Sequence, residues 1–491
     1  MSDLIIEPVD SVYIKVKCEK GYAKELSDFF TFKVPGHKFM PAFRNKMWDG
    51  QIKLYNIYKQ EIYAGLEDYV IQFAKDRSYN IERRETPKKN SITPDEVVKF
   101  AKLLNIPFNL HDHQVEGICH AINNDRCLLL SPTGSGKSLI IYTLVRYYLD
   151  RINPKKKILI IVPTISLVTQ MYSDFFEYSK TSEWKLRKYC HKIHGGEEKE
   201  TDKQIVISTW QSIYKMPKTY FDEFEVVIGD ECHLFKSKSL TAIMTKLTGC
   251  PYRIGTTGTL DGTFTHKLVI EGLFGRVHKV TSTKELMDKE LLSKLNIDCI
   301  VLNYPPEVKQ SCKKFKYAEE IDWLVQNQKR NEFICNLGES LKGNTLILFQ
   351  FVEKHGKVLY DILQKMNNKK VFFVHGGTEA DDREMIRKIV EKEENAIIVA
   401  SYGTFSTGIS IKRLHNIVFS SPSKSRIRVL QSIGRQLRKS EFKEKAKLYD
   451  IADDLSWKSH QNHTLRHFAE RLKIYEHEKF DFRKIVIPIE E

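Results

Sequence analysis

Two separated segments of the chain carry residue types that can bind a triphosphate. An apolar run, Cys127–Leu130, leads into residues 131–138 with the sequence SPTGSGKS, and Asp230-Glu231-Cys232-His233 follows downstream. Glycines at 134 and 136 allow backbone N–H groups to approach phosphates, and a helix beginning near Lys137 would direct its positive end at them. An anion cradle followed by paired carboxylates is typical of sites for phosphoryl transfer.

Each residue of these two segments has an expected role. Lys137 would contact the β- and γ-phosphates of ATP, and the Ser138 hydroxyl with Asp230 would hold Mg²⁺. Glu231 would orient or activate the attacking water. The remaining predicted nucleotide-binding residues of the loop are Pro132, Thr133, Gly134, Ser135 and Gly136. Ser131 stands where the strict GxxxxGK[ST] pattern has its first glycine, so an ordinary glycine turn is the alternative.

A third segment, 431–438, has the sequence QSIGRQLR and brings two arginines at helical spacing. The side chains of Gln431, Arg435 and Arg438 could share one helix face. We expect the two guanidinium groups to act as catalytic arginines. They would reach the γ-phosphate from the second of two lobes that the chain is predicted to form. The alternative is a basic helix bound to nucleic acid, and both interpretations can hold.

Composition restricts the class of protein. Among 491 residues, Lys plus Arg number 78 and Asp plus Glu 63, which gives a net charge of +15. This excess favours a polyanionic partner such as nucleic acid, although it also serves solubility. Nine cysteines without CxxC pairs or zinc spacing indicate reduced thiols. No apolar run approaches the ~18 residues of a membrane span, and no signal peptide is recognised. We therefore expect no membrane partner and a cytoplasmic location.

The chain is predicted to have an α/β fold in four parts. Residues 1–90 form a small α+β module, 91–282 a first lobe, 283–455 a second lobe, and 456–491 a helical tail. Short apolar runs bounded by polar breaks are typical of parallel strands buried on both faces. An order of strand, His-Gly-Gly and strand occurs around 194–196 and again around 375–377, which favours two similar lobes.

The order of these motifs resembles that of superfamily 2 helicases of the DExH type. In chain order, the segments that carry the likeness are LHDHQ at 110–114, VPT at 162–164, DECH at 230–233, TGT at 257–259 and the segment 399–411. The resemblance implies two tandem RecA-like lobes, parallel sheets flanked by helices. It assigns Gln114, Gln431 and Gly408 to nucleotide binding, and His233, Thr257 and Thr259 to coupling of hydrolysis with movement. Departures are His111, His113, Gly258 and Ser410, where the family has Arg, Tyr, Ala and Asp.

The same resemblance implies contacts to one nucleic-acid strand. Hydroxyls and backbone amides could hold phosphates without reading sequence, although a threonine at a strand end is as readily a helix cap. The predicted contact residues of the two lobes are Pro163, Thr164, Thr209, Trp210 and Thr404.

The first 90 residues narrow the resemblance. The segment 38–50, KFMPAFRNKMWDG, resembles the N-terminal module of the UvsW-like helicases of T-even phages. Between Lys33 and Lys59, six basic residues stand against one acid, and the aromatic residues Phe39, Phe43, Trp48 and Tyr55 are interleaved with them. Basic and aromatic residues together suit phosphate contact and stacking on exposed bases. We expect Arg44 and Lys46 to contact nucleic acid, and most of the aromatic side chains to form the core of this DNA-binding module.

The resemblance implies a monomeric ATP-dependent DNA helicase that needs ATP and Mg²⁺. Its expected partners are branched, single-stranded or double-stranded DNA and the RNA–DNA hybrids of R-loops. The expected setting is phage recombination, repair and replication control, in the host cytoplasm. An RNA helicase or a restriction-type translocase is one alternative. A passive annealing or scaffolding protein with a vestigial ATP site is the other.

Overall fold

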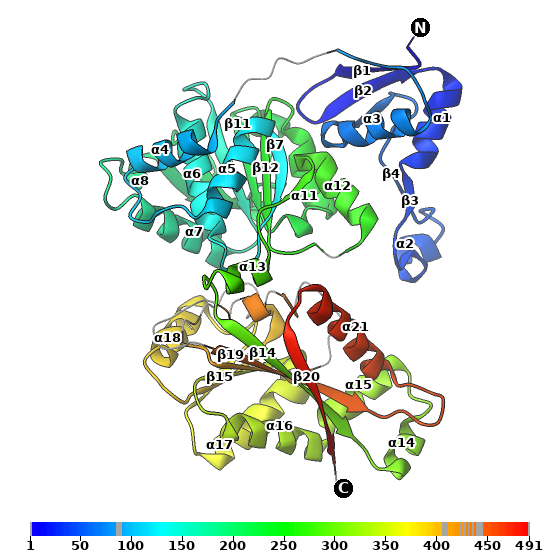
Figure 1. Ribbon diagram of the computed structural model, residues 1–491, viewed down its shortest axis with the longest axis vertical. Coiled ribbons are helices and arrows are strands. Elements are labelled where there is room, and N and C mark those ends of the chain that lie inside the picture. Colours follow the sequence, from blue (N-terminus) through cyan, green and yellow to red (C-terminus); the bar gives the residue numbers. More distant parts are fainter. Residues whose placement is uncertain are drawn as a thin grey trace. The chain divides into compact units, whose positions relative to one another are not determined.

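The computed structural model describes residues 2–84, 91–260, 262–404, 411, 413–421, 425, 429–430, 432–434, 437 and 445–489. The chain divides into two compact units (Figure 1). The first contains Met1–Ser131 and Gly136–Val280, and the second contains Thr281–Glu491 with the short segment Pro132–Ser135. Among the described residues, no helix combines the length and the apolar character that crossing a membrane requires.

The N-terminal module is built on a four-stranded sheet in the order β5-β2-β1-β6. Its elements are β1 (Leu4–Pro8), β2 (Tyr13–Cys18), α1 (Lys20–Phe29), β5 (Glu61–Tyr63), α3 (Glu67–Asp76) and β6 (Ile81–Arg83). Alternate residues of β1 and β2 are buried, as expected for strands with one face on a core. A separate antiparallel pair, β3 (Thr31–Lys33) and β4 (Gln51–Lys53), carries the segment between them away from this sheet (Figure 1).

This module shares one apolar core with the first lobe, through α12 (Phe264–Phe274). The Tyr69 hydroxyl donates a hydrogen bond of 2.8 Å to the carboxylate of Glu271, which is buried. Gly65, in the short helix η2 (Ala64–Leu66), lies so close to α12 that a Cβ there would be 2.0 Å from the Glu271 carbonyl oxygen. The N-terminal module is therefore packed onto the first lobe as part of the same unit.

The first lobe has a seven-stranded parallel sheet in the order β13-β7-β12-β11-β8-β10-β9. The strands are β7 (Arg126–Leu130), β8 (Lys157–Val162), β9 (Cys190–Ile193), β10 (Ile205–Thr209), β11 (Phe224–Asp230), β12 (Tyr252–Thr257) and β13 (Val277–Lys279). Helices α5 (Asp112–Asn124), α6 (Lys137–Leu149), α7 (Ile165–Tyr178) and α11 (Lys238–Lys246) flank it. Its central strands are buried along nearly their whole length, which confirms the expected parallel sheet.

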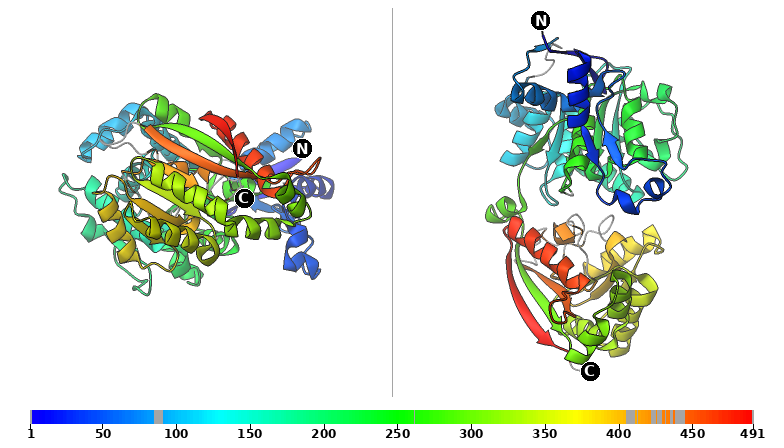
Figure 2. Two further views of the ribbon diagram at one scale, coloured as in Figure 1. Left: turned by 90° about the horizontal axis from the view of Figure 1, so that it is seen from below. Right: turned by 90° about the vertical axis from the view of Figure 1, so that its right-hand side faces the viewer.

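The second lobe has its own seven-stranded parallel sheet, in the order β16-β17-β15-β18-β19-β14-β20. The strands are β14 (Lys294–Asn303), β15 (Thr345–Phe349), β16 (Val371–Val374), β17 (Ile397–Ser401), β18 (Asn416–Phe419), β19 (Lys445–Asp454) and β20 (Asp481–Pro488). Figure 2 shows the red β20 along the green β14, at one edge. The tail predicted as helical is therefore helical only in α21 (His463–His477) and then contributes a strand.

The two lobes repeat one local topology. In each lobe, the third of three successive strands lies between the first and the second in the sheet. The order is β8-β10-β9 in the first lobe and β15-β17-β16 in the second. In each lobe His-Gly-Gly follows the outermost strand of the three, at His194 and at His375. The repeated sequence pattern thus corresponds to a repeated fold, and the prediction of two RecA-like lobes is confirmed.

Candidate nucleotide site and nucleic-acid surface

The DECH segment and the phosphate loop both lie at the carboxyl ends of a group of three neighbouring strands, β7, β12 and β11. In the sheet register Leu130 pairs with Thr257, and Thr256 pairs with Asp230. The backbone N–H of Ser131 donates to the Thr257 carbonyl oxygen at 2.9 Å. Parallel strands place their carboxyl ends along one edge, where loops build sites. The phosphate loop, the TGT segment and the DECH segment therefore share this edge.

The phosphate loop turns sharply between β7 and α6. Gly134 and Gly136 have φ angles of 87° and 82°, in the left-handed region that side chains rarely adopt. The Ser135 hydroxyl donates to the Pro132 carbonyl oxygen at 2.7 Å, and the Lys137 ammonium donates to that of Ser131 at 3.3 Å. Lys137 thus extends back over the loop while the N-terminus of α6 opens at the same place, an arrangement that suits a bound phosphate.

Gln114 lies against this loop. Its Oε1 accepts a hydrogen bond of 2.9 Å from the backbone N–H of His111, at the start of α5. A Cβ on Gly136 would be only 2.2 Å from Gln114 Nε2. The residue that the resemblance assigns to nucleotide binding is therefore placed beside the predicted phosphate loop, and the glycine at 136 makes room for its amide.

Asp230 is held at the end of β11 by two donors to one carboxylate oxygen. The Thr256 hydroxyl donates at 2.8 Å and the Glu231 backbone N–H at 2.9 Å. Burial raises the pKa of Asp230, the Glu231 carboxylate raises it further, and the charge of Lys137 opposes both. A buried carboxylate of this kind is stabilised as an anion by a nearby cation. Thr256 was not among the predicted site residues, because its role depends on the register between β12 and β11.

Glu231 leads into a chain of polar contacts that joins the acidic pair to the TGT segment. Glu231 has φ 53°, and its Oε2 lies 3.3 Å from His233 Nδ1, which is also 3.1 Å from the Thr257 hydroxyl. The Thr257 hydroxyl donates to the Thr259 carbonyl oxygen at 3.0 Å, so its oxygen is left to accept from a protonated His233 Nδ1. The structure therefore brings all three predicted coupling residues together with Glu231.

The predicted strand contacts lie at the ends of β8 and β10, further along the same edge. These two strands are neighbours, with Val162 paired to Thr209, and the Gln211 amide donates to the Pro163 carbonyl oxygen at 3.4 Å. Thr164 caps α7 by accepting from the Leu167 N–H at 3.3 Å, as the alternative interpretation expected. Trp210, partly buried, packs against the core of the first unit.

The other two predicted threonine hydroxyls also have protein partners. The Thr209 and Ser212 hydroxyls lie 2.9 Å apart in the first lobe, and those of Thr404 and Ser401 lie 2.7 Å apart in the second. Four predicted residues, Gly408, Gln431, Arg435 and Arg438, lie outside the described part of the chain.

Arg44 and Lys46 are exposed on residues 35–49, between β3 and β4, which we call the tip. The expectation that most of the aromatic residues here form a core is wrong, because Phe39 is 76% exposed and Phe43 and Trp48 are only half-buried. It is right for Tyr55, which is 2% exposed, beyond the tip. Sequence reasoning therefore preferred a core role to base stacking for Phe39, because interleaved aromatics alone do not reveal exposure.

Phosphate loops at a strand-to-helix junction occur in many nucleotide-binding folds. Here the strand with the acidic pair lies two positions from the loop strand, and the strand carrying the TGT segment fills the place between them. This arrangement, in the first of two lobes with matching topology, defines the class of superfamily 2 helicases.

Comparisons with known proteins narrow the class. Residues 3–83 match the family model "DNA helicase UvsW, N-terminal", 107–262 match "Type III restriction enzyme, res subunit", and 328–440 match "Helicase conserved C-terminal domain". The chain is 35% identical to the ATP-dependent DNA helicase uvsW of Enterobacteria phage T4, over 98% of each chain. It therefore belongs to the UvsW family of ATP-dependent DNA helicases, enzymes that hydrolyse ATP.

Two further similarities agree with this assignment. The crystal structure of T4 UvsW matches with a TM-score of 0.52 and 32% identity, over 99% of this chain and 100% of that one. The DNA 3'-5' translocase XPB2 of Sulfurisphaera tokodaii is 25% identical over 74% of this chain and 86% of its own.

Proposed function

We propose that this helicase uses ATP hydrolysis to unwind branched DNA, namely forks, Holliday junctions and the RNA–DNA hybrids of R-loops. The setting would be phage recombination, repair and replication control in the cytoplasm of the host. The observation that carries the proposal is the polar chain from Glu231 through His233 to Thr257 and Thr259. It connects the group that would act on water with the segment that couples hydrolysis to movement.

In the proposed reaction, the loop amides, Lys137 and the N-terminus of α6 bind and orient the triphosphate. Glu231 orients the attacking water and takes up its proton, and the contact with His233 fixes its carboxylate. From their sequence pattern, Arg435 and Arg438 would stabilise the charge that develops on the γ-phosphate, and Gln431, Gly408 and Gln114 would bind the nucleotide.

The donor set fits a magnesium ion. Asp230 is 8% exposed, and one of its carboxylate oxygens accepts hydrogen bonds from the Thr256 hydroxyl and the Glu231 backbone N–H. Its pKa is raised, and a bound cation would oppose that rise. Ser138 stands in the first turn of α6. In the described part of the chain, no group of three or more His, Cys, Asp or Glu side chains could hold a metal. Magnesium usually takes one or two protein ligands and completes its shell with phosphates and water. Bound there by Ser138 and Asp230, it would neutralise phosphate charge.

We further propose that Pro163, Thr164, Thr209, Trp210 and Thr404 line the path of one DNA strand. Because the hydroxyls of the three threonines are engaged within the protein, backbone amides at these strand ends are the better candidates for phosphate contact. Arg44 and Lys46 would add sequence-independent contacts to phosphates. The protein would act as a monomer.

The alternatives make different predictions. An RNA helicase or a restriction-type translocase would share the two lobes, but the N-terminal match to UvsW favours a DNA helicase. A passive annealing protein has no need of the polar chain around Glu231, which is complete in this structure.

The experiment compares ATP hydrolysis without nucleic acid and with single-stranded DNA, forked DNA or RNA, and then strand displacement on forks, Holliday junctions, R-loops and duplex RNA. We expect stimulation by DNA, and displacement that is faster on branched DNA and R-loops than on duplex RNA. Stimulation by RNA alone would favour an RNA helicase. Pairing of complementary strands, with neither hydrolysis nor displacement, would favour the annealing protein.

A further inference from the structure

The tip exposes apolar side chains to solvent. Phe39 is 76% exposed and Met47 75%, and neither η1 (His37–Phe39) nor α2 (Pro41–Arg44) has a buried residue. Large apolar side chains gathered on a protruding segment are unusual unless they contact a partner. The tip therefore has the composition of a contact surface, and burial within the module does not explain it.

The tip nevertheless has a defined conformation. The His37 ring donates from Nδ1–H to the Val34 carbonyl oxygen at 2.8 Å and packs edge-on against Phe43, with ring centroids 4.8 Å apart. Trp48 Nε1 donates to the Gln51 carbonyl oxygen at 2.8 Å. Gly50, with φ 76°, approaches so closely that a Cβ would lie 2.6 Å from the His37 ring. The exposed side chains are thus presented from a braced support.

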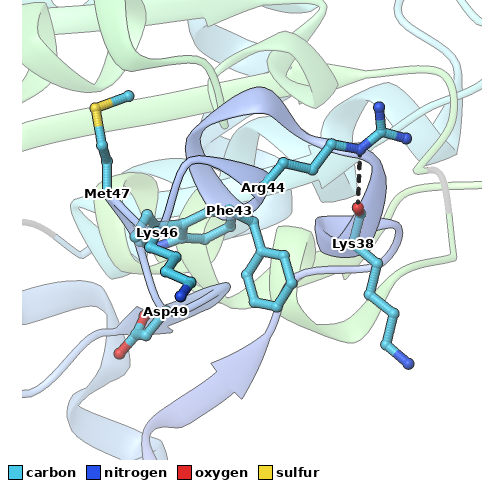
Figure 3. A pocket seen from close by; sticks show the side chains of 7 residues that line it. Lys38, Phe43, Arg44, Lys46, Met47 and Asp49 are labelled. Carbon is cyan, nitrogen blue, oxygen red and sulfur yellow. Dashed lines mark hydrogen bonds between the residues drawn. The ribbon is translucent and has the colours of Figure 1, made fainter.

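Cations surround an open pocket on the tip. The pocket measures roughly 840 Å³, and Figure 3 shows the Phe43 ring among Lys38, Arg44 and Lys46, with Met47 beside them. Arg44 Nε donates to the Lys38 carbonyl oxygen at 3.4 Å. Within the described residues, none of these three cations has a carboxylate at ion-pair distance. The acid on this surface, Asp49, lies 3.3 Å from Lys53.

These features fit the end of a DNA duplex better than other partners. Unpaired cations suit phosphates, and exposed aromatic or flexible apolar side chains suit the face of a base that has lost its stacking neighbour. Apolar side chains of this kind insert between base steps in other DNA-binding proteins. The chain's net charge of +15 disfavours a second copy of this basic chain, and the match of residues 3–83 to the N-terminal domain of a DNA helicase favours DNA over an acidic protein patch.

The tip is also connected to the part of the first lobe that would move with hydrolysis. At its base Phe32, in β3, packs against Phe264, at the start of α12, with ring centroids 5.7 Å apart. α12 is the first helix after the TGT segment at the end of β12. A displacement of that segment relative to the DNA would carry the tip with it.

We propose that the tip is the strand-separating element, in which Phe39 and Met47 press on the terminal base pair at a branch point. Lys38, Arg44 and Lys46 hold phosphates of the displaced strand. This inference rests on the proposed function, since it requires a motor that moves DNA toward the tip.

The test is the double variant Phe39→Ala/Met47→Ala. Because each lost base contact weakens binding of an unstacked base, fork unwinding should fall about tenfold or more. ATP hydrolysis stimulated by single-stranded DNA should stay within about twofold, because that strand offers no base pair to open. Tyr58→Ala is the matched control: Tyr58 is 96% exposed in the same module but lies outside the tip, so both rates should be unchanged. Phe39→Trp should retain unwinding.

A second measurement does not depend on loss of activity. The photoreactive residue p-benzoylphenylalanine, placed at position 39 of the full chain, should cross-link to bases next to the branch of a forked DNA, and at position 58 it should not. Fork unwinding at the wild-type rate by the double variant overturns the proposal, as does an equal fall in hydrolysis. Cross-links to a second protein chain, or only to single-stranded arms, also overturn it. Failure of wild-type protein to hydrolyse ATP with any DNA would instead refute the proposed function.

Discussion

Two regions of the first unit, the acidic and threonine residues at the strand ends and the tip, are built in opposite ways. At the strand ends, Asp230, Glu231, His233 and Thr257 are held by one another and are largely buried. At the tip, Phe39 and Met47 project into solvent from a braced turn. Chemistry on a phosphate benefits from groups fixed before the substrate arrives, whereas a partner of variable sequence is met by exposed, sequence-tolerant surfaces. The difference separates the step that hydrolyses ATP from the step that opens DNA.

The largest expected effect comes from Glu231→Gln. The amide keeps the size of the side chain and its contact with His233, but it cannot accept a proton from water. We expect kcat for DNA-stimulated ATP hydrolysis to fall by about 10²- to 10⁴-fold, with little change in nucleotide binding. Steady-state hydrolysis and a fluorescent-nucleotide titration measure the two quantities. A loss of less than about tenfold would remove Glu231 from its proposed role.

Gly136→Ala tests the geometry of the phosphate loop. The residue has φ 82°, and the new Cβ would displace the Gln114 amide. The backbone strain costs about 1–2 kcal/mol, so nucleotide affinity should fall about tenfold. Gly21→Ala is the control, because a Cβ at Gly21, in α1, would meet no other atom within 4 Å. Isothermal titration with a non-hydrolysable nucleotide measures both; equal affinities would contradict the fit of the loop.

Gly50→Ala tests the bracing of the tip. A Cβ there meets the His37 and Phe43 rings, and φ is 76°, so the tip must shift. We expect fork unwinding to fall roughly threefold to tenfold, with hydrolysis on single-stranded DNA unchanged. Gly36→Ala shares a positive φ, 73°, but meets no atom within 4 Å, so it separates strain from displacement of the rings. Equal unwinding by the Gly36 and Gly50 variants would show that the ring contacts do not position the tip.

The smallest effect concerns α5, the helix that carries Gln114. His120 stacks on His278 with ring centroids 3.8 Å apart, and burial together with His278 lowers the pKa of His120 to about 4. The unfolded chain, with a His pKa near 6.5, binds more protons between these values. The contribution of neutral His120 to the free energy of unfolding is therefore fully present above about pH 6.5 and is lost as the pH falls toward 4. This contribution is about 1–2 kcal/mol after allowance for partial exposure.

Thermal unfolding at pH 7.5 and pH 5 measures this effect. The wild-type melting temperature should drop more on acidification than that of His120→Gln, by a few degrees at most. Identical drops would show that His120 does not titrate as proposed.

The sequence identified segments that the structure brings together at the strand ends, because strict geometry limits the residues there. Positive φ angles at 134 and 136 require glycine, and an acidic pair after a buried strand leaves few interpretations. The two lobes were predictable because each repeats a strand, His-Gly-Gly and a strand. In both cases the pattern is local, so a short stretch of chain contains it.

What the sequence did not predict depends on contacts between distant residues. Thr256 bonds Asp230 only because β12 lies beside β11. β20 follows a polar helix and joins the sheet at its edge, where none of its residues is buried, so it does not need the longer apolar run of a central strand. The exposure of Phe39 follows from how β3 and β4 carry the tip away from the core, which composition does not encode.

The most direct test of the central claim is Lys137→Ala, with ATP hydrolysis and binding to forked DNA measured on the same preparation. We expect DNA-stimulated hydrolysis to fall at least about 100-fold because the β- and γ-phosphates lose their cation, while fork binding stays within about twofold of wild type. Hydrolysis by the variant at the wild-type rate would contradict the assignment of this loop to ATP, and with it the account of the site.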